Sequence, residues 1–214
     1  MSTTITAGNA TNGLAFSADN TGQLEVKTGT GAGTTALTLD TSQNATFAGT
    51  VTTVTGTIYP LVRGTSVAST SGTSIDFTGI PSTVRRLTVM LNGVSTTGIS
   101  PLLIQLGIST GPITTGYLGA STYMASTVAT AALTSGFLFN NWVAAANLGY
   151  GSITFTNLTG NQWVGSGTVA NTNTASNFVI SGAIALGALL DRVRITTVGG
   201  TDTFDAGNIN ILWE

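Results

Sequence analysis

Residues 86–94 read Arg86-Leu-Thr-Val-Met-Leu-Asn-Gly-Val94, and this stretch decides the fold class. Leu87, Val89 and Leu91 recur at every second position, which is the period that places side chains on one face of a β-strand. Asn92-Gly93 follows them, and an Asn-Gly pair is typical of the tight turn between two strands of a hairpin. The stretch therefore predicts antiparallel β-structure with a turn at residues 92–93.

The same two-residue period continues on both sides of this stretch, from Ser74 to the end of the chain. One segment, residues 142–148, is compatible with a short helix. The segments with the two-residue period predict strands. Apolar residues alternate at Ile75 and Phe77, at Leu102, Ile104, Leu106 and Ile108, at Ile153 and Phe155, at Phe178 and Ile180, at Val193 and Ile195, and at Ile209, Ile211 and Trp213. About eight to ten strands at this spacing predict one β-sandwich over residues 74–214, for which a jelly roll is the expected topology.

Residues 1–57 have a thinner pattern of short strands and turns. Apolar pairs occur at Leu14 and Phe16, Leu24 and Val26, and Leu37 and Leu39, and each pair offers one small apolar face. A hairpin with so little to bury is marginal in water. We therefore expect this region to form a shaft or anchor whose core is shared among several chains; the alternative is a disordered leader. Residues 58–73, rich in Ser and Thr, are expected to link it to the sandwich.

Charge is scarce in this chain. Charged residues make up 7% of the 214 residues, against roughly a quarter in ordinary soluble domains. No charged side chain occurs from Leu87 to Leu190. The net charge of −2 argues against nucleic-acid binding, which needs clustered Lys and Arg. The most apolar run, Gly182 to Leu190, is far too short to insert across a membrane.

Catalytic equipment is also scarce, because the sequence contains neither cysteine nor histidine. Paired carboxylates are the remaining option, as in glycosidases. The candidates are Asp76, Asp191, Asp202, Asp205 and Glu214, and their surroundings favour turns and ion pairs. We therefore predict a protein that is not an enzyme and needs no cofactor. Asp202 and Asp205 could supply oxygen ligands to a calcium ion, although the loop lacks the dense acidic pattern of a dedicated calcium site.

Two further groups of residues suggest contacts with partners. Arg85, Arg86, Asp191, Arg192 and Arg194 are candidates for ion pairs between subunits, with Asp76, Asp191 or Glu214 as partners; ordinary solvated charge is the alternative. The aromatic residues of the uncharged region could stack on sugar rings if they were exposed, or pack in the core and in a trimer interface. The candidate glycan contacts are Tyr117, Tyr123, Trp142 and Tyr150.

The chain resembles structural proteins of tailed bacteriophages. The segment Ala36-Leu-Thr-Leu-Asp-Thr-Ser-Gln-Asn-Ala-Thr-Phe-Ala-Gly-Thr-Val51 is similar to a module of phage fibre and virion proteins. Ser71-Gly-Thr-Ser-Ile-Asp-Phe-Thr-Gly-Ile-Pro81, the stretch 86–94 and Phe204-Asp-Ala-Gly-Asn-Ile-Asn-Ile-Leu212 are similar to a C-terminal domain of such proteins. The resemblance implies a homotrimer, made in the host cytoplasm and located on the surface of the virion with other virion proteins as partners.

Three functions compete on this basis. The first is a short tail fibre or spike, with an N-terminal attachment region and a head that could bind host surface polysaccharide. The second is a capsid decoration protein that clamps neighbouring capsomers. The third is a depolymerase, which the missing acid and base residues disfavour. The uncharged, Thr-rich surface suits the first two, because extensive contacts can cover a surface without charge.

Overall fold

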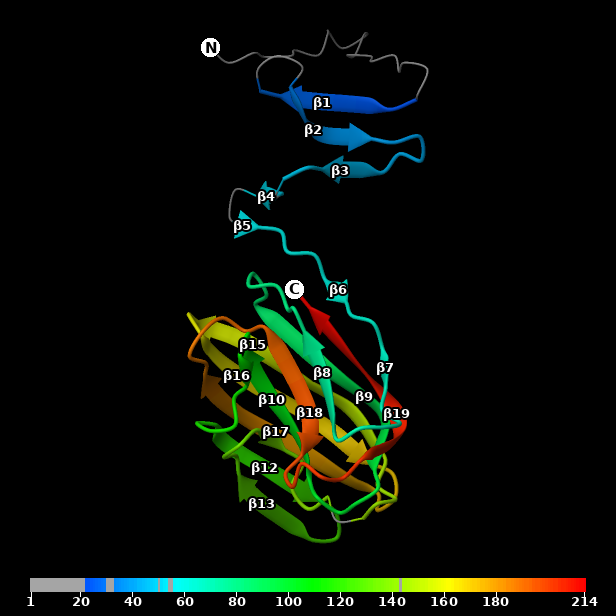
Figure 1. Cartoon of the computed structure of the whole chain (residues 1–214), viewed down its shortest axis with the longest axis vertical. Helices are drawn as coiled ribbons and strands as arrows, with labels where there is room; N and C mark the ends of the chain where they lie inside the picture. Colours follow the sequence, from blue (N-terminus) through cyan, green and yellow to red (C-terminus); the bar gives the residue numbers. More distant parts are fainter. Residues whose placement is uncertain (1–21, 30–32, 50, 54–55, 143) are drawn as a thin grey trace. The chain divides into compact units, whose positions relative to one another are not determined.

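A computed structural model describes residues 22–29, 33–49, 51–53, 56–142 and 144–214 (Figure 1). These residues form strands, turns and bends and contain no helix, so the predicted all-β class is confirmed. The described part of the chain accordingly offers no helix of the length and apolarity that crossing a bilayer needs. The chain divides into two units, Met1–Tyr59 and Pro60–Glu214.

The described strands of the first unit form two small sheets. An antiparallel three-stranded sheet has the order β1-β2-β3, and β4 pairs with β5. The bounds are β1 Leu24–Thr28, β2 Thr34–Leu39, β3 Ala45–Phe47, β4 Thr52–Thr53 and β5 Gly56–Thr57. The turn between β2 and β3 is closed by Asp40, whose Oδ1 accepts the backbone N–H groups of Ser42 and Asn44 at 2.9 Å. The predicted pair Leu14 and Phe16 lies outside the described residues.

The second unit contains two antiparallel sheets. The larger has nine strands in the order β13-β12-β17-β16-β15-β9-β19-β6, with β7 also paired to β19. Its strands are β6 Val62–Arg63, β7 Val67–Ala68, β9 Arg86–Thr96, β12 Leu118–Met124, β13 Val128–Ala132, β15 Gly149–Thr159, β16 Gln162–Asn171, β17 Ser176–Ala185 and β19 Phe204–Trp213. The smaller has the order β11-β10-β18-β8, with β14 paired to β10. Its strands are β8 Ser74–Thr78, β10 Leu102–Ile108, β11 Gly111–Pro112, β14 Phe137–Leu138 and β18 Arg192–Thr197.

A single apolar core joins the two sheets into a β-sandwich-like unit. Alternate residues of both sheets enter this core, as the two-residue period requires. The larger sheet contributes Leu87, Val89, Leu91, Ile153, Phe155, Trp163, Phe178, Ile180, Ile209 and Ile211; the smaller contributes Ile75, Phe77, Leu102, Ile104, Leu106, Val193 and Ile195. The sandwich expected from the sequence is therefore present, and the jelly-roll topology stays a prediction.

The prediction of a turn at Asn92-Gly93 is wrong. Both residues lie inside β9, where Gly93 is an extra residue opposite Gly149 and Tyr150 of β15. Gly93 has a φ of 66° and Gly207 of β19 has a φ of 89°. A Cβ on Gly207 would lie 2.3 Å from the Gly93 carbonyl oxygen, so the two strands approach closely here. An Asn-Gly pair supplies positive φ to a β-bulge as readily as to a turn, and sequence cannot tell these apart.

Two other segments also differ from expectation. The described residues of 142–148 form a turn, closed by the Asn147 N–H on the Ala144 carbonyl oxygen, and no helix. Two short strands, β6 and β7, lie in the predicted linker and pair with β19. The second unit therefore begins near Pro60, earlier than the predicted Ser74.

Phe137 is a test of this core. Its side chain is fully buried and makes edge-to-face contacts with Tyr117 and Phe155, at centroid distances of 5.6 and 4.8 Å. We expect Phe137→Ala to lower the free energy of unfolding of the second unit by about 3–5 kcal/mol, because a cavity replaces the ring. Denaturant unfolding followed by tryptophan fluorescence measures this change. Leu189→Ala, at an exposed position, is the control, and an equal loss in both variants would contradict the assignment of Phe137 to the core.

Candidate functional site

The four aromatic residues proposed as glycan contacts do not form a common surface. Tyr117, Tyr123 and Trp142 are 2%, 8% and 0% exposed and belong to the core, so their prediction as surface contacts is corrected. Trp142 and Tyr123 both pack against Phe178, at centroid distances of 5.7 and 5.5 Å. Tyr150, 38% exposed, is the member of the group with an accessible ring. Core packing, the alternative considered for these aromatics, accounts for the other three.

Tyr117 has a structural role at the end of β10. Its hydroxyl oxygen accepts the backbone N–H of Leu106 at 2.9 Å and donates to the carbonyl oxygen of Ile113 at 3.0 Å. Burial raises the pKa of this hydroxyl well above its ordinary value of 10.0, although the hydrogen bond from Leu106 acts in the opposite direction. The neutral phenol thus ties the segment 113–117 to the core strand β10.

Three of the four arginines predicted to form ion pairs do so, and their partners lie within the same chain. Arg194 binds Asp76 through two parallel contacts of 2.9 and 3.0 Å, and Arg86 binds Glu214 at 2.6 Å. Arg192 contacts Asp191 at 3.3 Å, and Arg85 donates to the carbonyl oxygens of Ser82 and Val84. The acidic partners were predicted correctly, but these contacts need no second subunit. Such half-exposed pairs contribute about 1 kcal/mol or less each.

Asp202 stabilises the loop around Ser100 by a hydrogen bond. Its Oδ2 accepts the backbone N–H of Ser100 at 2.8 Å, and its carboxylate occupies the space beside Gly98. Asp205 is exposed on β19. Within the described ranges no three acidic side chains gather into a group that could hold a metal ion. The position of Asp202 fits the turn role expected for it, and a calcium site at Asp202 and Asp205 gains no support from the geometry.

The β1-β2-β3 sheet has one apolar face. Paired residues lie on the same face of a sheet, and the register pairs Leu24 with Leu39 and Val26 with Leu37, which in turn pairs with Phe47. The opposite face carries Glu25, Thr38 and Thr46. Among the described side chains of residues 22–59, none is buried; Val26 and Phe47 are 46% and 53% exposed. This apolar face is thus open to a partner.

The nine-stranded sheet has a broad outer face. Over five adjacent strands, β13, β12, β17, β16 and β15, the side chains on this face carry no charge, and we call this set of side chains the uncharged face. Its members are Val128, Thr130 and Ala132; Leu118, Ala120, Thr122 and Met124; Asn177, Val179, Ser181, Ala183 and Ala185; Gln162, Val164, Ser166, Thr168 and Ala170; and Tyr150, Ser152, Thr154 and Thr156. The charged residues of this sheet lie on β6, β9 and β19, at its other end.

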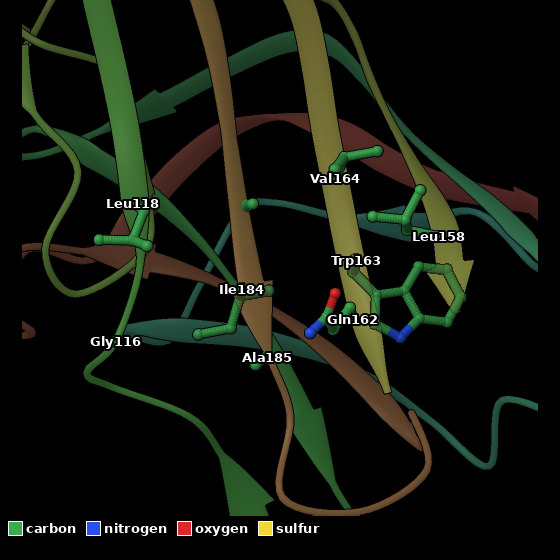
Figure 2. Close-up of a pocket in the computed structure, with 9 residues that line it drawn as sticks. Gly116, Leu118, Leu158, Gln162, Trp163, Val164, Ile184 and Ala185 are labelled. Carbon is green, nitrogen blue, oxygen red and sulfur yellow. The ribbon is translucent and has the colours of Figure 1, made fainter. Parts of the chain in front are cut away.

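A shallow apolar groove is present at one end of the uncharged face (Figure 2). It measures about 230 Å³ and is lined by Leu118, Leu158, Gln162, Trp163, Val164 and Ile184, with Gly116, Ala183 and Ala185. Figure 2 shows Leu118 on one side and Leu158 and Val164 on the other. The volume is below the 300–1,000 Å³ typical of small-molecule pockets. The groove therefore suits one or two apolar side chains of a partner.

Sequence reasoning found the uncharged region but not this face. The run from Leu87 to Leu190 shows that charge is missing, but not that β12, β13, β15, β16 and β17 are neighbours in one sheet. Two neighbouring pairs in the sequence hinted at it. Val164 follows Trp163 and Val179 follows Phe178, and in a strand adjacent side chains point to opposite faces. With the aromatic residue of each pair in the core, the valine points outward.

Because of Tyr117, the stability of the second unit should decrease at alkaline pH. Its pKa is raised in the folded state, so folding favours the protonated phenol. This contribution is fully present below pH 10.0, where the unfolded tyrosine also keeps its proton, and is lost as the pH rises above that value. We expect the free energy of unfolding to fall above pH 10.0, and to fall less steeply in Tyr117→Phe.

The same variant removes the hydrogen bond to Leu106, which should cost about 1–3 kcal/mol at neutral pH. Tyr150→Phe makes the same chemical change at an exposed ring and is the matched control. Denaturant unfolding between neutral and alkaline pH measures both effects. A Tyr117 phenolate that forms in the folded protein at the ordinary tyrosine pKa of 10.0 would contradict the assignment.

Comparison with known proteins assigns this chain to no family. No family model matches it, and no curated protein or solved structure is significantly similar to it. The open apolar face of the β1-β2-β3 sheet and the uncharged face of the nine-stranded sheet are therefore the features on which a functional proposal depends.

Proposed function

We propose that this chain is a structural, non-enzymatic component of the surface of a bacteriophage particle, a short trimeric tail fibre or spike. Its first unit attaches to the particle and associates with other copies, and its second unit is the head. The observation that carries the proposal is the open apolar face of the β1-β2-β3 sheet, on which Leu24, Val26, Leu37, Leu39 and Phe47 lie without a buried core.

The energetic reason is the size of this sheet. Three short strands stabilise themselves only when an apolar face is covered. Each Leu, Val or Phe side chain contributes roughly 1.5–3 kcal/mol when it is fully buried. Three copies around an axis would cover three such faces at once, and identical chains supply matching apolar residues. A homotrimer is therefore an economical way to stabilise this unit.

The assignment to a phage particle depends on the resemblance of segments 36–51, 71–81, 86–94 and 204–212 to virion proteins. The scarcity of charge, with 7% charged residues, is consistent with a surface that is covered by other subunits. Host surface polysaccharide stays a candidate ligand of the head. Tyr150 is the one of the four proposed aromatic contacts whose ring is accessible in the single chain.

A capsid decoration protein is the second candidate. The uncharged face favours it, because a broad, uncharged surface suits extended contact with neighbouring subunits of a capsid. In that case the first unit would anchor the chain at a junction of capsomers, and the copies would be far more numerous than those of a fibre.

Leu37 tests the shared core. It lies in the central strand β2 between Val26 and Phe47. We expect Leu37→Asp to weaken the trimer, so that it dissociates at a higher concentration than wild type in native mass spectrometry, because a charge would be buried without a partner. A Leu37→Asp trimer as stable as wild type would contradict the shared core. Thr38→Asp places the same charge on the opposite face of the same strand and should leave the trimer intact. A wild-type monomer at micromolar concentration, or dissociation by both variants, would contradict a core shared through this face.

Copy number distinguishes the two candidate locations. Quantitative mass spectrometry of purified particles of the phage that encodes this chain should give on the order of ten to a hundred copies for a tail fibre and several hundred for a decoration protein, because a capsid offers many more equivalent sites than a tail. Absence of the chain from purified infectious particles would reject both.

A further inference from the structure

We infer that the uncharged face is the trimer interface of the head: three copies place β12, β17 and β16 toward a common threefold axis, with these faces packed against one another. The inference deepens the proposed function and depends on its trimer. It adds an interface in the second unit, separate from the apolar face of the β1-β2-β3 sheet.

The first argument is the composition of the face. Six of its side chains are exposed large apolar residues: Leu118, Met124, Val128, Tyr150, Val164 and Val179. Leu118, Val164 and Val179 are 72%, 41% and 39% exposed. Most of the remaining positions are Ser, Thr and Ala, which lose little side-chain entropy when covered. Exposed apolar residues also occur singly elsewhere in the unit, as at Ile99 and Leu189, but on this face six of them share one surface that carries no charge.

The second argument concerns the occupant. A surface without charge excludes a charged partner surface, since a charge buried against it would have no counter-ion. The outer face of the smaller sheet is unsuitable, because it carries Asp76, Arg192 and Arg194. Between the outer faces of the two sheets of the second unit, the matching uncharged surface is the uncharged face itself. A second and a third copy of the chain therefore supply the complementary surface.

The groove supplies the specific fit. Leu118 and Leu158 stand at its sides (Figure 2), and both are mostly exposed in the single chain. A neighbouring copy placed around the axis would bring its own Leu118, Val164 or Val179 to this surface. Apolar side chains that enter a hollow of this size would bury the groove and fix the rotation of one head against the next.

Cysteine cross-linking tests this inference cleanly, because the natural sequence contains no cysteine. In full-length Val179→Cys, we expect a short bismaleimide to join two of the three chains, so that denaturing gels show a covalent dimer beside a monomer. Leu189→Cys is the matched control: Leu189 is also exposed and apolar, but it lies in the connection between β17 and β18, outside the uncharged face. Little cross-linking is expected there.

The outcomes separate this inference from the proposed function. Native trimers that cross-link at Val179→Cys but not at Leu189→Cys support both. Native trimers that do not cross-link at Val179→Cys, or cross-link equally at both positions, overturn the head interface and leave the trimer standing. A monomeric wild-type chain overturns both. A native dimer that cross-links at Val179→Cys overturns the threefold arrangement and the proposed trimer together.

A charge on the face provides a second readout. Val179→Arg should lower the melting temperature of the trimer well below that of Leu189→Arg, because three like charges would meet near the axis. Equal melting temperatures for the two arginine variants would overturn the inference.

Discussion

The pairing of β9 with strands on both of its sides is the interaction on which the second unit depends. β9 pairs with β15 and with β19, so its residues join the middle of the chain to its C-terminal strand. Leu87 and Val89 are fully buried beneath this sheet and face the smaller sheet. The larger sheet is therefore organised around a strand whose partners lie about 60 and 120 residues away in sequence.

Much of this fold could be predicted from alternation alone. Strands over Ile75–Phe77, Leu102–Ile108, Phe178–Ile180 and Ile209–Trp213 are where the two-residue period placed them. The bulge at Gly93 could not be distinguished from a turn, because both need the same positive φ. The shortest strands could not be predicted from the sequence either. Strands of two residues such as β6 and β7 are defined by their partner β19, and a local pattern holds no information about that partner.

The candidate sites were harder to predict than the fold, for physical reasons. Whether Tyr117 and Trp142 are buried depends on how their loops fold onto the core, and no alternation around them shows it. The partners of Arg86 and Arg194 were foreseeable, because so few acidic residues exist. The arrangement of β12, β17 and β16 into one uncharged surface was not, because it requires the complete strand order of the sheet.

The pairing of β6 and β7 with β19 also has a mechanical meaning. The chain enters the second unit through these two short strands, which are held by backbone hydrogen bonds such as Gly64 N–H to the Ile211 carbonyl oxygen and Ser69 N–H to the Gly207 carbonyl oxygen. If the molecule is tethered by its first unit and pulled from the second, the tension reaches the core through this narrow ladder. The C-terminal strand then serves as the anchor that resists unravelling under load, and the ladder is where a rising force would first act.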